Sequence, residues 1–102
     1  KAGRGVALTV VNPDSMPHNW VLTKPDALET VSLLSARMAA EPDAYSRHYV
    51  PDSPDILCHT RLLDAGKRTT VYFNAPKTPG RYPYLCTFPG HAQIMRGVVI
   101  VE

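Results

Sequence analysis

Ten prolines and six glycines divide this 102-residue sequence into short apolar runs. Runs such as Val6 to Val11 are rich in β-branched residues and end at turn-forming residues, a pattern typical of short strands. The same pattern predicts six strands, at residues 6–11, 18–23, 56–63, 69–74, 81–86 and 97–102. Short strands separated by turns of this kind indicate an all-β fold, a Greek-key β-sandwich.

One segment departs from the strand pattern and predicts a helix at about residues 27–40. Its apolar residues recur at helical spacing and are Leu28, Val31, Leu34 and Met38. Asp26 precedes the segment and Glu29 follows it three residues later, which is the arrangement of a capping box. Pro42 ends the helix and a proline-containing loop follows, so we expect a single insertion of helix and loop at about residues 26–55.

Two features organise the strands that follow the insertion. Residues 64–67 contain a glycine and separate two strand segments, so we expect strands 56–63 and 69–74 to pair as a hairpin. Pro83 lies within the strand predicted at 81–86 and has no N–H to donate. This position should therefore face a sheet edge or a bulge.

Length and composition limit what such a fold can do. A chain of 102 residues with 44% hydrophobic and 20% charged residues can form one packed core, so we expect a single domain over residues 1–102. No apolar run approaches the length of a membrane span, so membrane insertion is not expected. The formal net charge is +2 and the basic residues are not clustered, which argues against a nucleic-acid partner.

The loop between the last two predicted strands carries a thiol, an imidazole and a thioether in close succession, at Cys86, His91 and Met95. These ligand types suit copper, and two histidines with one cysteine and a weak axial methionine form the blue-copper arrangement. His18 is the best candidate for the second histidine, because a sandwich can bring its loop to the same end as the last loop.

The two cysteines, Cys58 and Cys86, also allow other interpretations, namely one disulfide or a free pair. A zinc site would draw on Cys58, His59, Cys86 and His91. Such a tetrahedral site leaves His18 and Met95 without a role. With Cys86 assigned to copper, Cys58 is expected to be a buried free thiol.

The segments Met16-Pro-His-Asn-Trp-Val-Leu22 and Cys86-Thr-Phe-Pro-Gly-His91, together with Met95, resemble the azurin and auracyanin branch of the cupredoxins. The resemblance covers essentially the whole chain, including Cys58-His-Thr-Arg-Leu62. It implies one type 1 copper, held by His18, Cys86 and His91 in a plane with Met95 as a distant axial ligand. It also implies a second axial contact from the carbonyl of Pro17, at a position where azurins usually have glycine.

Residues next to the ligands have expected roles as well. The Asn19 side chain and backbone N–H groups near Phe88 should orient the ligand loop and donate hydrogen bonds to the Cys86 sulfur. Pro89 has no N–H to offer there. The remaining histidines are expected on the surface, without a ligand role: His48 and His59.

The resemblance implies a single-electron carrier rather than an enzyme. Its partner would be a redox protein such as a cytochrome, or a fused redox domain, that docks on an apolar surface near His91. The residues expected on that surface are Met16, Pro17, Pro89, Gly90, Ala92 and Met38. Copper storage or delivery, and service as the redox module of a larger multidomain oxidoreductase, are the alternatives. The resemblance also implies an exported, periplasmic location.

Residues 1–5 resemble the link that follows a first strand in cupredoxins. We therefore expect the first strand of the sandwich to be missing here, either because that segment was trimmed or because the chain is one module excised from a longer protein.

Overall fold

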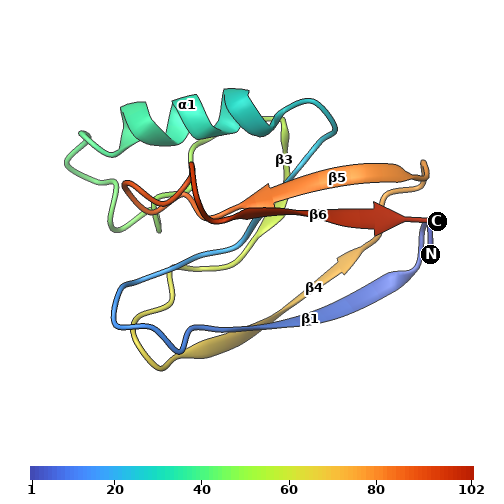
Figure 1. Ribbon diagram of the computed structural model, residues 1–102, viewed down its shortest axis with the longest axis horizontal. Coiled ribbons are helices and arrows are strands. Elements are labelled where there is room, and N and C mark those ends of the chain that lie inside the picture. The colour runs from blue at the N-terminus through green and yellow to red at the C-terminus, as the bar shows by residue number, and fades with distance from the viewer.

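The structure, a computed structural model, describes residues 1–102. In chain order the elements are β1 (Gly5–Val11), β2 (Val21–Thr23), α1 (Leu28–Met38), β3 (Ile56–His59), β4 (Arg68–Asn74), β5 (Gly80–Leu85) and β6 (Arg96–Val101). They form three layers, in which α1 and the two-stranded sheet lie on opposite faces of the four-stranded sheet (Figure 1).

Both sheets are antiparallel. β1 and β4 pair along their full lengths, from Gly5 opposite Asn74 to Val11 opposite Arg68. The second sheet has the strand order β3-β2-β5-β6, so that β2 and β5 are neighbours although they are far apart in the chain. An all-β sandwich with one inserted helix confirms the predicted fold class.

The predicted hairpin between residues 56–63 and 69–74 is wrong. β3 pairs with β2, whereas β4 pairs with β1 in the other sheet. The reason lies between them, where Leu62 and Leu63 are both buried and break the alternation of a strand. Leu63 instead exchanges two backbone hydrogen bonds with His18. The turn that follows carries the chain from one sheet to the other.

The capping box predicted at the start of α1 is also wrong. The N-cap residue is Ala27, and no side chain caps the helix. The N–H of Ala27 donates to the carbonyl of Lys24, in a turn that gives Asp26 a φ of 64°. This turn directs Ala27 into the core, where it is buried, and the aspartate takes no capping position.

α1 covers the outer face of the four-stranded sheet. The buried cluster between them consists of Val21, Ala27, Val31, Val50 and Leu85. Met38, at the last turn of the helix, is only 4% exposed. The expectation that Met38 lies on a docking surface is therefore wrong.

A second core fills the space between the two sheets. Its buried residues are Trp20, Leu22, Tyr82 and Val101. The Trp20 ring lies 5.8 Å from the rings of both Phe73 and Tyr84, measured between centroids. A Cβ at Gly97 would overlap the ring of Tyr84, so a larger residue at this position of β6 would force the ring to move.

Pro83 is accommodated within β5 because the neighbouring strand is short. β2 pairs with β5 only at Tyr84 and Leu85. The N–H of Cys86 donates toward the β6 side, to the carbonyl of Met95. Because N–H directions alternate along a strand, the missing N–H of Pro83 faces the β2 side, beyond the end of that pairing. The position is locally an edge, as predicted.

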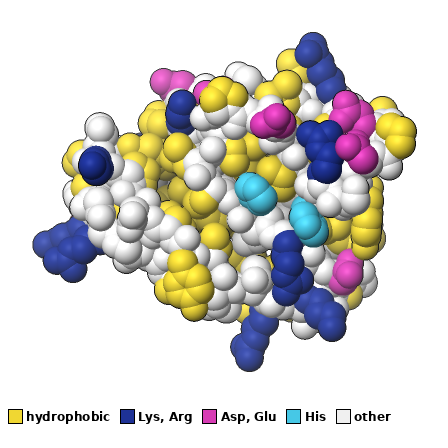
Figure 2. Space-filling model, turned by 180° about the vertical axis from the view of Figure 1, so that it is seen from behind, with side chains coloured by type: hydrophobic (Ala, Val, Ile, Leu, Met, Phe, Trp, Pro, Cys, Tyr) yellow, Lys and Arg dark blue, Asp and Glu magenta, His cyan; other side chains and the backbone are white.

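Charges of both signs share the surface. Seen from the side opposite Figure 1, Lys and Arg side chains stand in several separate groups, some of them beside Asp and Glu (Figure 2). The chain contains no helix with the length and apolar character that a membrane span needs.

The loop between β5 and β6, residues 86–95, lies at the end of the sandwich opposite the two termini (Figure 1). The connection from β1 to β2 turns at the same end. The fold therefore brings together the two segments in which the candidate ligands occur.

Candidate metal centre

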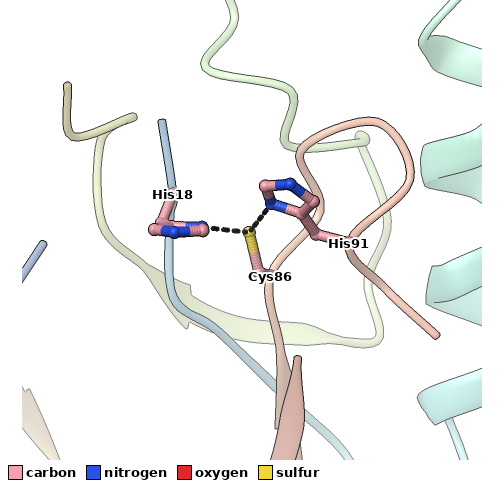
Figure 3. A group of neighbouring side chains, drawn as sticks. All are labelled: His18, Cys86 and His91. Atoms are coloured by element: carbon pink, nitrogen blue, oxygen red, sulfur yellow. Dashed lines mark hydrogen bonds between the residues drawn. The ribbon is translucent and has the colours of Figure 1, made fainter. Parts of the chain in front are cut away.

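Three predicted ligands converge at this end of the sandwich. The Cys86 Sγ lies 3.9 Å from Nδ1 of His18 and 3.7 Å from Nδ1 of His91. The three ligand atoms all lie within 4.8 Å of one another. Figure 3 shows the two imidazoles on either side of the sulfur, each with one ring nitrogen directed toward it.

These separations leave room for one metal ion among the three side chains. An ion about 2.3 Å from a thiolate and about 2.0 Å from each nitrogen sets a sulfur-to-nitrogen separation of about 3.7 Å in a trigonal plane, and about 3.5 Å in a tetrahedron. The observed 3.9 and 3.7 Å lie within a few tenths of an ångström of both values, so an ion fits between the sulfur and each nitrogen. One thiolate with two imidazoles in this geometry is a donor set suited to copper.

Backbone hydrogen bonds close the loop that carries Cys86 and His91. The His91 N–H donates to the Phe88 carbonyl, and the Met95 N–H donates to the His91 carbonyl at 2.8 Å. The Cys86 N–H in turn donates to the Met95 carbonyl. Gly90 has a φ of 84°, a backbone conformation that glycine adopts without strain, and it turns the chain into His91.

His18 is held by a partner in another segment. Its N–H donates to the Leu63 carbonyl and its carbonyl accepts from the Leu63 N–H, at 3.0 and 2.7 Å. The ring is mostly buried, with 12% of the side chain exposed. The imidazole is thus fixed from the backbone side before any metal binds.

Asn19 connects this segment to the ligand loop. Its Nδ2 donates to the Thr87 hydroxyl and to the His48 carbonyl, and its Oδ1 accepts from the Thr87 N–H at 2.8 Å. Asn19 and Thr87 are both buried. The residue after His18 is therefore tied to the residue after Cys86, which sets the distance between the two ligands.

The Cys86 sulfur lies in a nearly dry environment. The residue is 3% exposed, and burial raises the pKa of its thiol. Backbone hydrogen bonds involving Asn19 and Phe88 act in the opposite direction and lower this pKa. Such donors favour the thiolate, which is the form that binds a metal.

The His91 imidazole is kept neutral by its surroundings. Burial lowers its pKa, the nearby His18 lowers it further, and the carboxylate of Asp14 partly offsets both. The ring contacts Phe88 and His18, with centroids 5.0 and 4.9 Å away. Neutral imidazole is the metal-binding form of histidine.

Comparisons with known proteins agree with this geometry. The family of copper-binding proteins described as the plastocyanin/azurin family matches residues 1–102. The chain belongs to this family. Auracyanin-A from Chloroflexus aurantiacus is 33% identical over 99% of this chain and 61% of its own length, so the chain spans about three-fifths of that relative. An azurin from Pseudomonas denitrificans is 30% identical over the whole chain and 82% of its own length.

Solved structures of the family superimpose well on this chain. The auracyanin from Roseiflexus castenholzii has a TM-score of 0.82 at 32% identity, covering 99% of this chain and 79% of its own. Auracyanin A, a blue copper protein from Chloroflexus aurantiacus, has a TM-score of 0.83 at 32% identity, covering 99% and 80%. These relatives confirm the predicted cupredoxin resemblance and fold, and a family of copper-binding proteins agrees with the single copper predicted for the ligand group.

Met95 and the Pro17 carbonyl are the remaining two ligands that the cupredoxin resemblance implies. Met95 is half-buried and lines a cavity of about 410 Å³ together with His18 and Cys86. Pro17, whose carbonyl is the predicted second axial contact, is also half-buried. Ligation by Met95 and Pro17 remains a prediction.

The other cysteine and histidines lie apart from the site. Both Cys58 and Cys86 are free, so the disulfide does not form. His59 is exposed, and its Nδ1 donates to the carbonyl of Thr60. His48 is exposed, and its Nδ1 accepts from the N–H of Leu62. The ligand group contains neither Cys58 nor His59, which removes the zinc alternative.

The sequence interpretation missed Asp14. Its Oδ2 lies 2.9 Å from Nε2 of His18, on the side of the ring away from Cys86. The only signal in the sequence is an acidic residue four positions before the histidine, within a loop whose path the sequence does not define.

Proposed function

We propose that this chain carries single electrons through one type 1 copper, which His18, Cys86 and His91 would hold with Met95 and the Pro17 carbonyl as weaker ligands. The bound copper would supply a Cu(I)/Cu(II) couple. The convergence of three donor atoms on a hydrogen-bonded frame, in a member of the plastocyanin/azurin family, supports this proposal.

The protein residues contribute by keeping the ligand positions the same in both oxidation states. Asn19 and Thr87 fix the separation of the segments that carry His18 and Cys86. Backbone hydrogen bonds involving Asn19 and Phe88 favour negative charge on the Cys86 sulfur, and burial keeps water away from it. A frame fixed before the metal binds lets an electron enter or leave with little rearrangement.

We place the exit for the electron at the edge of His91. Its Nδ1 faces Cys86, whereas its Nε2 makes no hydrogen bond within the chain. Pro89, Gly90 and Ile94 are exposed in the same loop, and Met16 is exposed in the loop before His18. A small, mainly apolar surface suits brief contact with a redox partner, such as a cytochrome or a fused redox domain.

Residues 1–102 would act as one cupredoxin domain with its helix and loop inserted between β2 and β3. We further propose that the domain works outside the cytoplasm, in the periplasm or an equivalent exported compartment. An oxidising compartment without competing thiol reductants suits a protein that depends on one cysteine thiolate.

Copper loading of the purified protein tests the ligand assignment. We expect one copper per chain, an intense visible thiolate-to-copper absorption band and a narrow copper hyperfine splitting. Cys86→Ser should abolish the band, because an alcohol does not replace the thiolate donor. His59→Ala is the matched control and should leave the spectrum unchanged. Copper-loaded wild type without the band would contradict the proposal.

Electron self-exchange separates a carrier from a storage or delivery domain. A carrier should exchange electrons rapidly between its oxidised and reduced forms, since the ligand positions need not move. A rate slower by orders of magnitude, with the visible band present, would favour storage or delivery over electron transfer.

A further inference from the structure

Asp14 contacts the ring nitrogen of His18 that faces away from the metal site. The Oδ2–Nε2 distance is 2.9 Å. The carboxylate is 62% exposed, whereas the His18 side chain is 12% exposed. The pair therefore connects a buried candidate ligand to a solvated anion.

The loop that carries Asp14 is held at both ends. At its start Asn12 is 1% exposed, and its Nδ2 donates to the carbonyls of Met16 and Leu63 at 2.8 and 2.9 Å. The Asn12 Oδ1 accepts from the N–H of Asp14 itself. At its end His18 is bonded to Leu63 through the backbone. The backbone that carries the Asp14 carboxylate is thus held by a buried hydrogen-bond network.

The contact selects one tautomer of the imidazole. An ionised carboxylate only accepts hydrogen bonds, so the proton of the neutral ring must lie on Nε2. Nδ1, which faces the Cys86 sulfur, then carries the lone pair that a metal requires. His91 has no such partner, because its Nε2 makes no hydrogen bond within the chain.

We propose that Asp14 is a positioning residue for the copper ligand His18: its carboxylate fixes the Nε2–H tautomer, strengthens Nδ1 as a donor and favours the oxidised metal. This inference rests on the proposed copper function. A carboxylate on the far nitrogen of a histidine ligand raises ligand basicity, and its negative charge stabilises the more positive metal ion. The two imidazoles thereby differ in role: the far nitrogen of His18 is bonded to a carboxylate, whereas the far nitrogen of His91 has no hydrogen-bond partner within the chain.

Three variants separate hydrogen bonding from charge. Asp14→Asn keeps an oxygen that can accept from Nε2–H but removes the charge. Asp14→Ala removes both. Asp64→Asn is the control, because Asp64 lies beside the same loop, where its carbonyl contacts Asn12, and its side chain makes no hydrogen bond to His18.

The reduction potential of the copper-loaded proteins gives the first measurement. Loss of this kind of partner typically costs about 10-fold to 100-fold in metal affinity. We expect Asp14→Asn to weaken Cu(II) binding relative to Cu(I) about tenfold, which corresponds to a rise of about 59 mV in a one-electron couple. Asp14→Ala should raise the potential at least as much, and Asp64→Asn should shift it far less. Equal shifts in Asp14→Asn and Asp64→Asn would overturn the proposal.

The imidazole nitrogen chemical shifts of the copper-free protein give a second measurement, independent of the metal. His18 should be in the Nε2–H tautomer in wild type and in Asp14→Asn, and should become a mixture of tautomers in Asp14→Ala. An unchanged tautomer in Asp14→Ala would overturn the proposal. Failure of the copper function itself would be recognised separately, by wild-type protein that lacks the visible band.

Discussion

At the scale of single residues, the Asn19 side chain connects the segment of His18 to two other segments of the site by hydrogen bonds. Its amide links three segments: its own, the start of the loop after β5 at Thr87, and the carbonyl of His48. His48 and the following Tyr49 both have positive φ, 58° and 56°, so the carbonyl is presented by a backbone that is costly to form. The hydrogen bonds of Asn19 help to hold this conformation.

Asn19→Ala should destabilise the fold by about 2–4 kcal/mol, because it leaves a buried N–H and a carbonyl without partners. Denaturant unfolding of the copper-free protein measures the loss. Asn74→Ala, at an exposed position of β4, is the control and should change stability little. Equal stability of Asn19→Ala and wild type would show that water replaces these bonds at no cost.

Residues of the site that share one loop could be predicted from the sequence. Cys86 and His91 lie five positions apart, and a loop between two strands keeps them close whatever its details. Asp14 could not be predicted, because its contact with His18 depends on a loop shaped by the buried Asn12. The cap proposed at Asp26 failed for a related reason, since burial of Ala27 decides how the chain enters α1.

At the scale of elements, the ligand loop is attached to the helix by Arg96. Its Nε donates to the Ala92 carbonyl at 2.8 Å, and its Nη1 donates to Glu29 at the start of α1 at 2.9 Å. Its Nη2 is buried without a partner. Arg96, the first residue of β6, therefore connects the ligand loop to the start of α1 through its side chain.

Arg96→Met should keep the side-chain volume while releasing the Ala92 carbonyl. We expect a stability loss of about 1 kcal/mol, since one hydrogen bond and a partly exposed ion pair are lost. Removal of the unpartnered buried N–H limits the loss. Amide hydrogen exchange over residues 91–95 should become faster, and copper should pass more rapidly to a chelator. Arg81→Met, an exposed change in β5, is the control; identical exchange in both variants would mean that Arg96 does not brace the loop.

The strands were largely predictable and their partners were not. Four of the six predicted strand segments overlap their observed strands closely, because β-branched runs and turn residues are local signals. The segment predicted at 56–63 ends at His59. The segment at 18–23 shortens to Val21–Thr23, since Asn19 turns its side chain to the ligand loop. The predicted pairing of β3 with β4 was wrong because it depended on burial that the local pattern does not show. Leu62 and Leu63 are both buried between the two strands, and the strands belong to different sheets.

At the scale of the whole molecule, Cys58 makes stability depend on pH without taking part in the proposed site. This thiol is free, as predicted, but half-buried rather than buried. Cys58 lies opposite Leu22 in the sheet and packs against the core between the sheets. Burial raises the pKa of its thiol from 9.0 to about 11. The unfolded chain therefore releases this proton at a lower pH than the folded protein does.

Because the unfolded state binds fewer protons in this interval, the free energy of unfolding should fall as pH rises from 9.0 to about 11. Below pH 9.0 the contribution of Cys58 is fully present, since the thiol is protonated in both states. Cys58→Ala should lose less stability over the same interval, while lysines and tyrosines titrate alike in both proteins. Urea unfolding of the two copper-loaded proteins at matched pH values measures the difference. Parallel curves would show that the core admits the Cys58 thiolate without penalty, which would contradict its burial between the sheets.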